Sequence, residues 1–140
     1  MVEIAAGGNH SLARRANGTV FAWGSNSSGQ TNVPAGLNGV AAISAGDNHC
    51  LALRSNGTLV AWGDNNSGQT NIPSGLSNVL AIAAGYHHNL AVRSNRTVAA
   101  WELNVYGETA VPPTLSNVVA IAGGYFYSVA LRSNGTVVTW

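Results

Sequence analysis

A repeat of 39 residues constrains the fold of this chain more than any other feature. The four tryptophans stand 39 residues apart, and columns of isoleucine, glycine, alanine, arginine and asparagine keep the same step. The tryptophan column comprises Trp23, Trp62, Trp101 and Trp140. No insertion interrupts the register, so the repeat organises the whole chain. The copies are residues 1–39, 40–78, 79–117 and 118–140, and the last copy stops at its tryptophan.

Each copy predicts three short β-strands. In the second copy these are VAAISAG (40–46), HCLALRS (49–55) and TLVAW (58–62). An Asn-Gly pair precedes the third strand, and between apolar runs this pair indicates a hairpin with a two-residue type I′ turn. The third copy has Arg96 in place of the glycine, so we expect that turn to be strained or reshaped. The rest of each copy, such as 63–78, is a polar connector with a proline, for which we expect an irregular edge segment.

Both faces of the predicted sheets are apolar. Leu51 and Leu53 point to one side of their strand, whereas Cys50 and Ala52 point to the other. One face is bulky and the other small, so the large residues of one copy can pack against the small residues of the next. This arrangement predicts an all-β propeller with four blade cores in one domain, residues 1–140. A β-solenoid is the alternative, although its coils carry parallel strands and no tight hairpin.

Composition argues against several classes of function. Charged residues make up 8% of the chain, against about 25% in average soluble proteins, and the net charge is +1. There is no lysine and no basic run, so we expect no nucleic-acid partner. No apolar run approaches the length of a membrane span, and we expect no membrane partner. The start MVEIAAGG lacks the features of a signal peptide, which indicates a cytosolic protein or a chain cut from a larger one.

The sequence contains no pattern that predicts catalysis, a metal or a cofactor. The single Cys50 cannot form an internal disulfide. Nucleophile triads, phosphate-binding loops and cysteine clusters are absent, and Asp47 and Asp64 share a copy without a base partner. We therefore predict that the protein is not an enzyme.

Two polar columns repeat with the fold. They comprise His10, His49 and His88, with Tyr127 in the fourth copy, and Arg15, Arg54, Arg93 and Arg132. Equivalent residues of neighbouring blades lie about 10 Å apart, too far to share a metal ion. We expect the histidine rings to be buried and bonded to backbone, and the arginines to bond loop carbonyls of the adjacent blade. The alternatives are a ring of cations for anionic ligands and, for the tryptophans, ligand stacking instead of core packing.

The segment VAAISAGDNHCLALRSNGTLVAWGDNNSGQ (40–69) resembles the repeat of the regulator of chromosome condensation family. The resemblance covers the whole chain, and the short connector is similar to the bacterial branch, which includes secreted β-lactamase-inhibitor propellers. It implies a propeller, usually of seven blades, that binds proteins through loops on one face, and it favours an extracellular or cell-surface origin. The eukaryotic founder acts on a small nuclear GTPase and docks on chromatin, but nothing here matches its functional insertions. The chain also departs in having four blade cores and a divergent third connector (102–114).

The copies differ most in the turn between their first and second strands, and the start of each connector falls at the same end of the blade. Aromatic residues gather there, as suits a protein interface, although drift in tolerant loops is the alternative. The predicted partner-binding rim comprises Asp47, Asn48, Tyr86, His87, Tyr106, Tyr125 and Phe126. We therefore predict a non-catalytic protein-binding or scaffold propeller. A lectin-like or small-ligand-binding propeller and a fragment of a longer seven-bladed propeller are the alternatives.

Four blade cores do not close a ring at the family's geometry. Seven blades turn about 51° each, so four sweep about 206° and leave two apolar blade faces exposed. Two chains supply eight blades at about 45° each. We therefore expect a homodimer that closes an eight-bladed ring, with Trp140 of one chain next to Val2 of the other.

Overall fold

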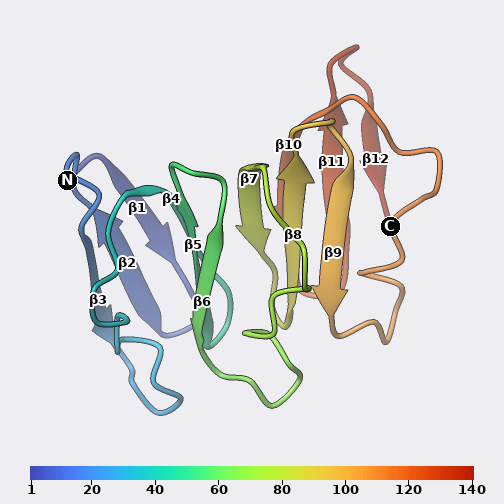
Figure 1. Cartoon of the computed structure of the whole chain (residues 1–140). Helices are drawn as coiled ribbons and strands as arrows, with labels where there is room; N and C mark the ends of the chain where they lie inside the picture. The colour runs from blue at the N-terminus through green and yellow to red at the C-terminus, as the bar shows by residue number, and fades with distance from the viewer.

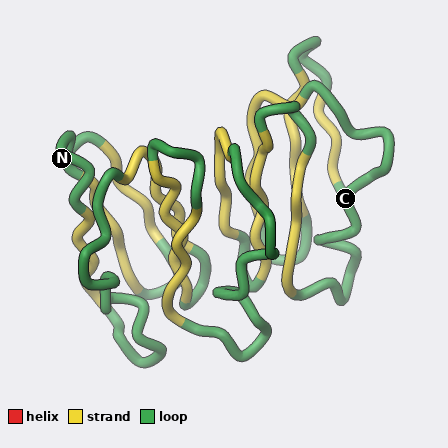
Figure 2. Tube along the Cα trace, in the orientation of Figure 1, coloured by secondary structure: helices red, strands yellow, loops and turns green.

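The computed structural model describes residues 1–140 and contains twelve β-strands and no helix (Figure 2). The strands form four antiparallel sheets of three strands, each in chain order. The sheets are β1 (Glu3–Ala6), β2 (His10–Arg14) and β3 (Val20–Gly24); β4 (Val40–Ala45), β5 (His49–Arg54) and β6 (Leu59–Gly63); β7 (Val79–Ala84), β8 (His88–Arg93) and β9 (Val98–Glu102); and β10 (Val118–Gly123), β11 (Ser128–Arg132) and β12 (Val137–Thr139). They stand side by side, with the two termini at opposite ends of the row (Figure 1). The four predicted blade cores are confirmed. The structure has no helix that could span a membrane.

The hydrophobic core lies between neighbouring sheets. Between the second and third sheets, Leu51 and Leu53 pack with Ala91, Ala99 and Trp101. Equivalent clusters fill the other two interfaces. The bulky face of one sheet thus packs against a face of the next sheet that consists of smaller residues and one tryptophan, as the alternation of large and small residues predicts.

The hairpin between the second and third strands of each sheet differs from the predicted turn. In the second sheet the Gly57 N–H donates to the Arg54 carbonyl at 2.9 Å, and the Arg54 N–H donates to the Thr58 carbonyl at 2.8 Å. The loop therefore has three residues, and only the last has a positive φ, 80° at Gly57. This is typical of a type I turn followed by a bulge, so the predicted type I′ turn is wrong. The Asn56 Oδ1 accepts hydrogen bonds from the Thr58 N–H and hydroxyl, at 3.1 and 2.7 Å, which explains why asparagine and threonine recur here.

Arg96 keeps the same turn with a φ of 62°. A residue with a Cβ is destabilised by about 1–2 kcal/mol in this left-handed conformation. We expect Arg96→Gly to raise the free energy of unfolding by about 1 kcal/mol, measured by urea denaturation with tryptophan fluorescence. The matched control is Gly135→Arg, because Gly135 holds the equivalent position and nothing lies within 4 Å of its added Cβ. The free energy of unfolding of that variant should fall by a similar amount. Equal stability of Arg96→Gly and the wild type would contradict the interpretation.

Each connector crosses onto the sheet that follows it. The Trp62 indole Nε1 and the Cys50 thiol both donate to the Gln30 carbonyl, at 3.0 and 3.3 Å. The contact from the second strand recurs on the third and fourth sheets, where the Asn89 amide and the Ser128 hydroxyl donate to the Gln69 and Glu108 carbonyls. The indole N–H groups of Trp101 and Trp140 have no such partner. Trp62 and Trp101 are each only 7% exposed, whereas Trp23, which no connector covers, is 53% exposed. The connectors contain turns but no strand, so each blade has no edge strand beyond its three.

Candidate functional site

The two ends of every sheet carry different parts of the repeat. The turns between first and second strands and the starts of the connectors lie at one end, which we call the turn end. The hairpins between second and third strands lie at the other, the hairpin end. All seven rim residues lie at the turn end, on the β4–β5, β7–β8 and β10–β11 turns and the third connector.

Five rings of the rim form one continuous array. Tyr86 and Tyr125 are stacked, with centroids 3.9 Å apart and an angle of 26° between their planes. His87 contacts Tyr86 edge-on at 4.3 Å, and Phe126 contacts Tyr125 edge-on at 4.2 Å. The Phe126 ring also lies 4.6 Å from the ring of Tyr106 in the third connector. Residues from two turns and a connector, up to 40 positions apart in the sequence, thus share one aromatic surface.

Asp47 and Asn48 occupy the neighbouring turn. The Asn48 amide Nδ2 donates to the Asp47 Oδ2 at 2.6 Å, and the Asn48 Oδ1 accepts from the Gln30 Nε2 at 3.0 Å. The one ion pair of the chain joins Arg14 to Glu3 at the hairpin end. The Asp47 carboxylate therefore has no cationic partner within the chain.

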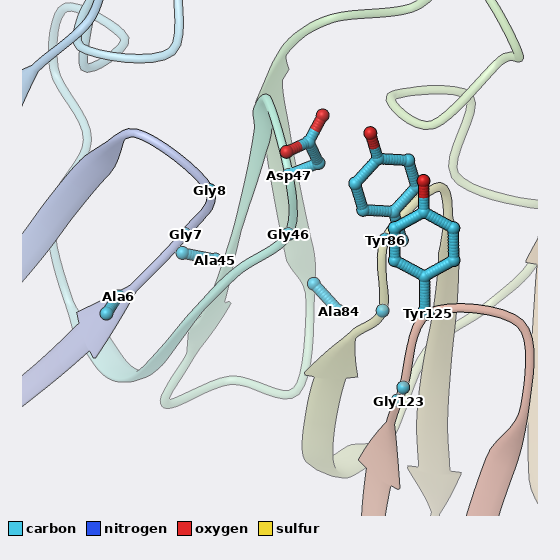
Figure 3. A pocket seen from close by; sticks show the side chains of 12 residues that line it. Ala6, Gly7, Gly8, Ala45, Gly46, Asp47, Ala84, Tyr86, Gly123 and Tyr125 are labelled. Atoms are coloured by element: carbon cyan, nitrogen blue, oxygen red, sulfur yellow. The ribbon is translucent and has the colours of Figure 1, made fainter.

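Tyr86 joins this carboxylate to the aromatic array. Its pKa is raised to about 12, first by a hydrogen bond with Tyr125 and then by the negative charge of Asp47. Figure 3 shows the Asp47 carboxylate beside the stacked rings of Tyr86 and Tyr125. Carboxylate and rings thus form one local electrostatic unit.

A pocket of about 280 Å³ opens beside this unit, and the first turns of all four sheets line it (Figure 3). Asp47, Tyr86 and Tyr125 supply its larger side chains, and the remaining lining residues are glycine and alanine. The small residues leave room at the pocket, while the three larger side chains determine its chemistry.

Main-chain hydrogen bonds join the sheets at this end. The Gly8 N–H donates to the Asp47 carbonyl at 3.1 Å, the Asp47 N–H to the Tyr86 carbonyl at 3.2 Å, and the Tyr86 N–H to the Gly124 carbonyl at 3.0 Å. The turns are therefore connected through backbone atoms, and the rim side chains are not needed for that connection.

The histidine column lies inside the blade interfaces. The pairs are His10–Cys50, His49–Asn89 and His88–Ser128, with the ring Nε2 at 3.1, 2.9 and 3.1 Å from the sulfur or oxygen of the partner. Each ring contacts a side chain of the next sheet, and the expected backbone bond is present only for His10, with Asp47. Burial lowers the pKa of His49 to about 4, and it lowers the pKa values of His10 and His88 as well. The column thus links neighbouring blades through neutral rings.

The arginine column does not bond the adjacent blade as expected. Arg93 donates to the Thr97 hydroxyl and the Val98 carbonyl of its own sheet, both at 3.5 Å, and Arg15 lies over the Phe21 ring at 4.4 Å. Arg54 and Arg132 each leave a buried Nε without a partner. Arg14, outside the column, makes the contact with the next blade, at 3.3 Å to the Val40 carbonyl. Arg14 occupies the repeat position of Leu53, Val92 and Leu131, and it pairs with Glu3 in the same register that Leu53 keeps with Ala42.

Glu108 is a buried carboxylate that the sequence analysis missed. It replaces the glutamine that the first two connectors carry, Gln30 and Gln69, and it is fully buried. Its Oε2 accepts the Tyr106 N–H at 2.7 Å, whereas its Oε1 has no partner. The change from glutamine to glutamate within a repeat column was the signal that could have drawn attention to it.

Charge is segregated between the two ends. The hairpin end holds all six arginines and one glutamate, a net charge of +5, whereas the turn end holds four carboxylates and no arginine, a net charge of −4. The turn-end carboxylates are Asp47, Asp64, Glu102 and Glu108. The small net charge of the chain therefore conceals two ends of opposite sign.

Small antiparallel sheets that pack face to face around a shared pocket are the blades of a β-propeller, and this is the class of protein that the fold defines. The model of the regulator of chromosome condensation (RCC1) repeat matches residues 1–30 and 40–69. In these residues, and in the fold of its blades, the chain is similar to the proteins of the RCC1 repeat family.

Solved structures with the same fold include Prp20p from Saccharomyces cerevisiae, with a TM-score of 0.86 and 24% identity over 99% of this chain and 44% of Prp20p. Yeast RCC1 (Prp20) bound to Kap60 has a TM-score of 0.80 and 26% identity over 99% of this chain and 43% of that one. The computationally designed Ika4 protein has a TM-score of 0.62 and 21% identity over 98% of this chain and 88% of Ika4. The chain thus spans less than half the length of Prp20p. A search of curated proteins finds no match.

Proposed function

We propose that the protein is a non-catalytic binding module that recognises another protein through the rim. The observation that carries this proposal is the aromatic array, in which Tyr106, Tyr125 and Phe126 are 67%, 52% and 38% exposed. Tyrosine and other aromatic residues anchor many protein interfaces. The structure of Prp20p is described together with its binding to Gsp1p and histones, and that of yeast RCC1 as bound to Kap60, which supports protein binding as a use of this fold.

The lectin-like alternative fits the rim less well. A propeller with one sugar per blade repeats the same polar residues in every blade. The turns of the four sheets instead carry Gly8-Asn9, Asp47-Asn48, Tyr86-His87 and Tyr125-Phe126. These pairs differ in charge and in size, so they favour a single asymmetric contact surface over repeated ligand sites.

Selection of a phage-displayed random peptide library on the full chain tests the rim. Peptides recovered on the wild type should bind Tyr125→Ala at least about 30-fold more weakly, since a truncated aromatic anchor costs about 2 kcal/mol. Leu80→Ala is the matched control, because Leu80 is 48% exposed, close to the 52% of Tyr125, and lies at the hairpin end. Equal losses in the two variants, or no loss in either, would contradict the assignment of the rim.

We further propose that two copies close an eight-bladed ring. Every internal interface joins the trailing face of one sheet to the leading face of the next, and the chain leaves one face of each kind uncovered. On the first sheet Ile4 is 78% exposed, whereas the equivalent Ile43 is 6% exposed. On the fourth sheet Tyr127 and Leu131 are 54% and 37% exposed. A second copy would place Tyr127 against its partner's Ser11, the residue that occupies the repeat position of Cys50, Asn89 and Ser128.

Light scattering and native mass spectrometry should give twice the chain mass of 14.3 kDa, or about 28.6 kDa. Ile4→Glu should shift the mass to that of one chain, because it places a charge in the seam. Val105→Glu is the control, since Val105 is 64% exposed in the third connector, away from both uncovered faces. A soluble wild-type monomer at micromolar concentration would overturn the ring.

A further inference from the structure

The charge distribution indicates what kind of partner the rim suits. The turn end carries −4 and no arginine, whereas the hairpin end carries +5. Separated charges of this kind create a potential that attracts partners of opposite sign and repels those of like sign. An acidic segment is therefore disfavoured at the rim, and a basic one is attracted to it.

Two carboxylates, those of Asp47 and Asp64, lie next to the aromatic array. Asp47 lies beside Tyr86 and has no cationic partner in the chain. Asp64 lies beyond His87, and Gln69 bridges the two, with its Nε2 at 3.2 Å from the Asp64 Oδ2 and 3.3 Å from the His87 Nδ1. A peptide segment that crosses the array thus passes one negative charge near Tyr86 and another near His87.

Tyrosine rings beside a carboxylate that has no cationic partner suit a guanidinium group in particular. The planar guanidinium stacks on an aromatic ring and donates a fork of N–H groups to a carboxylate at the same time. An ammonium group is compact and strongly hydrated, so it makes only one of these contacts well. The pocket of about 280 Å³ that Asp47, Tyr86 and Tyr125 help to line leaves space for such a side chain.

We propose that the turn end binds a basic segment of a partner protein, in which an arginine side chain lies against the Tyr86–Tyr125 stack and pairs with Asp47. This inference rests on the proposed function of the rim and adds the chemical class of its partner. The array then orients the segment, and the field of the turn-end carboxylates speeds its approach.

Three fluorescent peptides of the form GSXGSXGSX, with X as arginine, citrulline or glutamate, test the proposal by fluorescence anisotropy on the full chain. Citrulline keeps the size of arginine and removes its charge. The arginine peptide should bind at least about tenfold more tightly than the citrulline peptide, because both the cation–π contact and the ion pair are lost. The glutamate peptide should show no binding. Raising the salt concentration should weaken binding of the arginine peptide, since salt screens the attraction between exposed charges.

Variants locate the contact. Asp47→Asn should weaken binding of the arginine peptide at least about fivefold, and Tyr86→Ala should weaken its binding by a similar factor. Glu3→Gln is the matched control, because it changes the net charge equally at the hairpin end, and it should change the affinity less than about twofold. Amide chemical shifts on adding the arginine peptide should move at residues 46–48, 85–88 and 124–127. Circular dichroism of each variant establishes that the fold is retained.

The proposal fails if the arginine peptide does not bind at millimolar concentration, if citrulline binds as well as arginine, or if Asp47→Asn and Glu3→Gln weaken binding equally. The library selection separates this failure from that of the rim itself. Selected peptides that need Tyr125 but show no enrichment in arginine would overturn the basic partner and leave the rim as a protein-binding surface. Selected peptides that are indifferent to Tyr125 would overturn both.

Discussion

Gly46→Ala should lower the free energy of unfolding by about 3 kcal/mol, the upper range for overpacking a filled interior. The added Cβ would collide with the ring of His49 and lie 2.6 Å from the Gly85 carbonyl of the next sheet. A flexible side chain could move aside, but the ring is fully buried and the carbonyl belongs to the backbone. The methyl group therefore fits only if two blades separate. Urea denaturation followed by tryptophan fluorescence measures the loss.

Gly75→Ala separates this collision from the general effect of adding a methyl group. Gly75 lies in the second connector with nothing within 4 Å of its added Cβ, although its φ of 79° disfavours alanine. This variant should lose only about 1 kcal/mol, from backbone conformation. If the two variants lose the same amount, close packing of the blades at Gly46 is not the cause.

Stability should fall as the pH is lowered from about 6.5 to about 4. Burial depresses the pKa of His49 to about 4 in the folded chain, below the ordinary value of 6.5, and it lowers the pKa values of His10 and His88 in the same direction. The unfolded chain therefore takes up protons in this window before the folded chain does, which favours unfolding. The shift of His49 alone corresponds to about 3 kcal/mol between the two limits. Urea midpoints at several pH values measure the trend.

His49→Gln identifies the source of the trend. Glutamine can still bond Asn89, but it does not titrate, so stability should depend less steeply on pH between about 6.5 and 4. The variant should also be less stable than the wild type at neutral pH, because a smaller side chain fills the interface. An unchanged slope would show that other groups dominate acid unfolding.

The repeat made the architecture predictable. Columns spaced by 39 residues determine the strands, and the alternation of bulky and small residues along 49–55 predicts how one blade packs on the next. The end of the blade that carries Tyr86, Tyr125 and Phe126 followed from strand direction alone. Charge segregation was accessible by the same argument, since each charged residue has a known place in the repeat.

Contacts between blades were not predictable in the same way. The partner of His49 is Asn89, and nothing within a single copy indicates that the ring bonds a side chain of the following copy. The contact of Arg14 with Val40 comes from a residue that the other copies replace with Leu53, Val92 and Leu131, so the repeat columns do not indicate it. The turn type was mistaken because Asn-Gly suits two hairpin geometries. The threonine at position 58, whose hydroxyl bonds Asn56, distinguishes them.

The main-chain bonds between the turns separate assembly from recognition. The N–H of Asp47 and the carbonyl of Tyr86 hold two blades together whatever side chains those residues carry. A substitution there changes what the surface binds while the bond that joins the blades remains. The residues of each turn can therefore be exchanged while the backbone bonds between the blades are kept. The number of possible binding surfaces then multiplies with every blade.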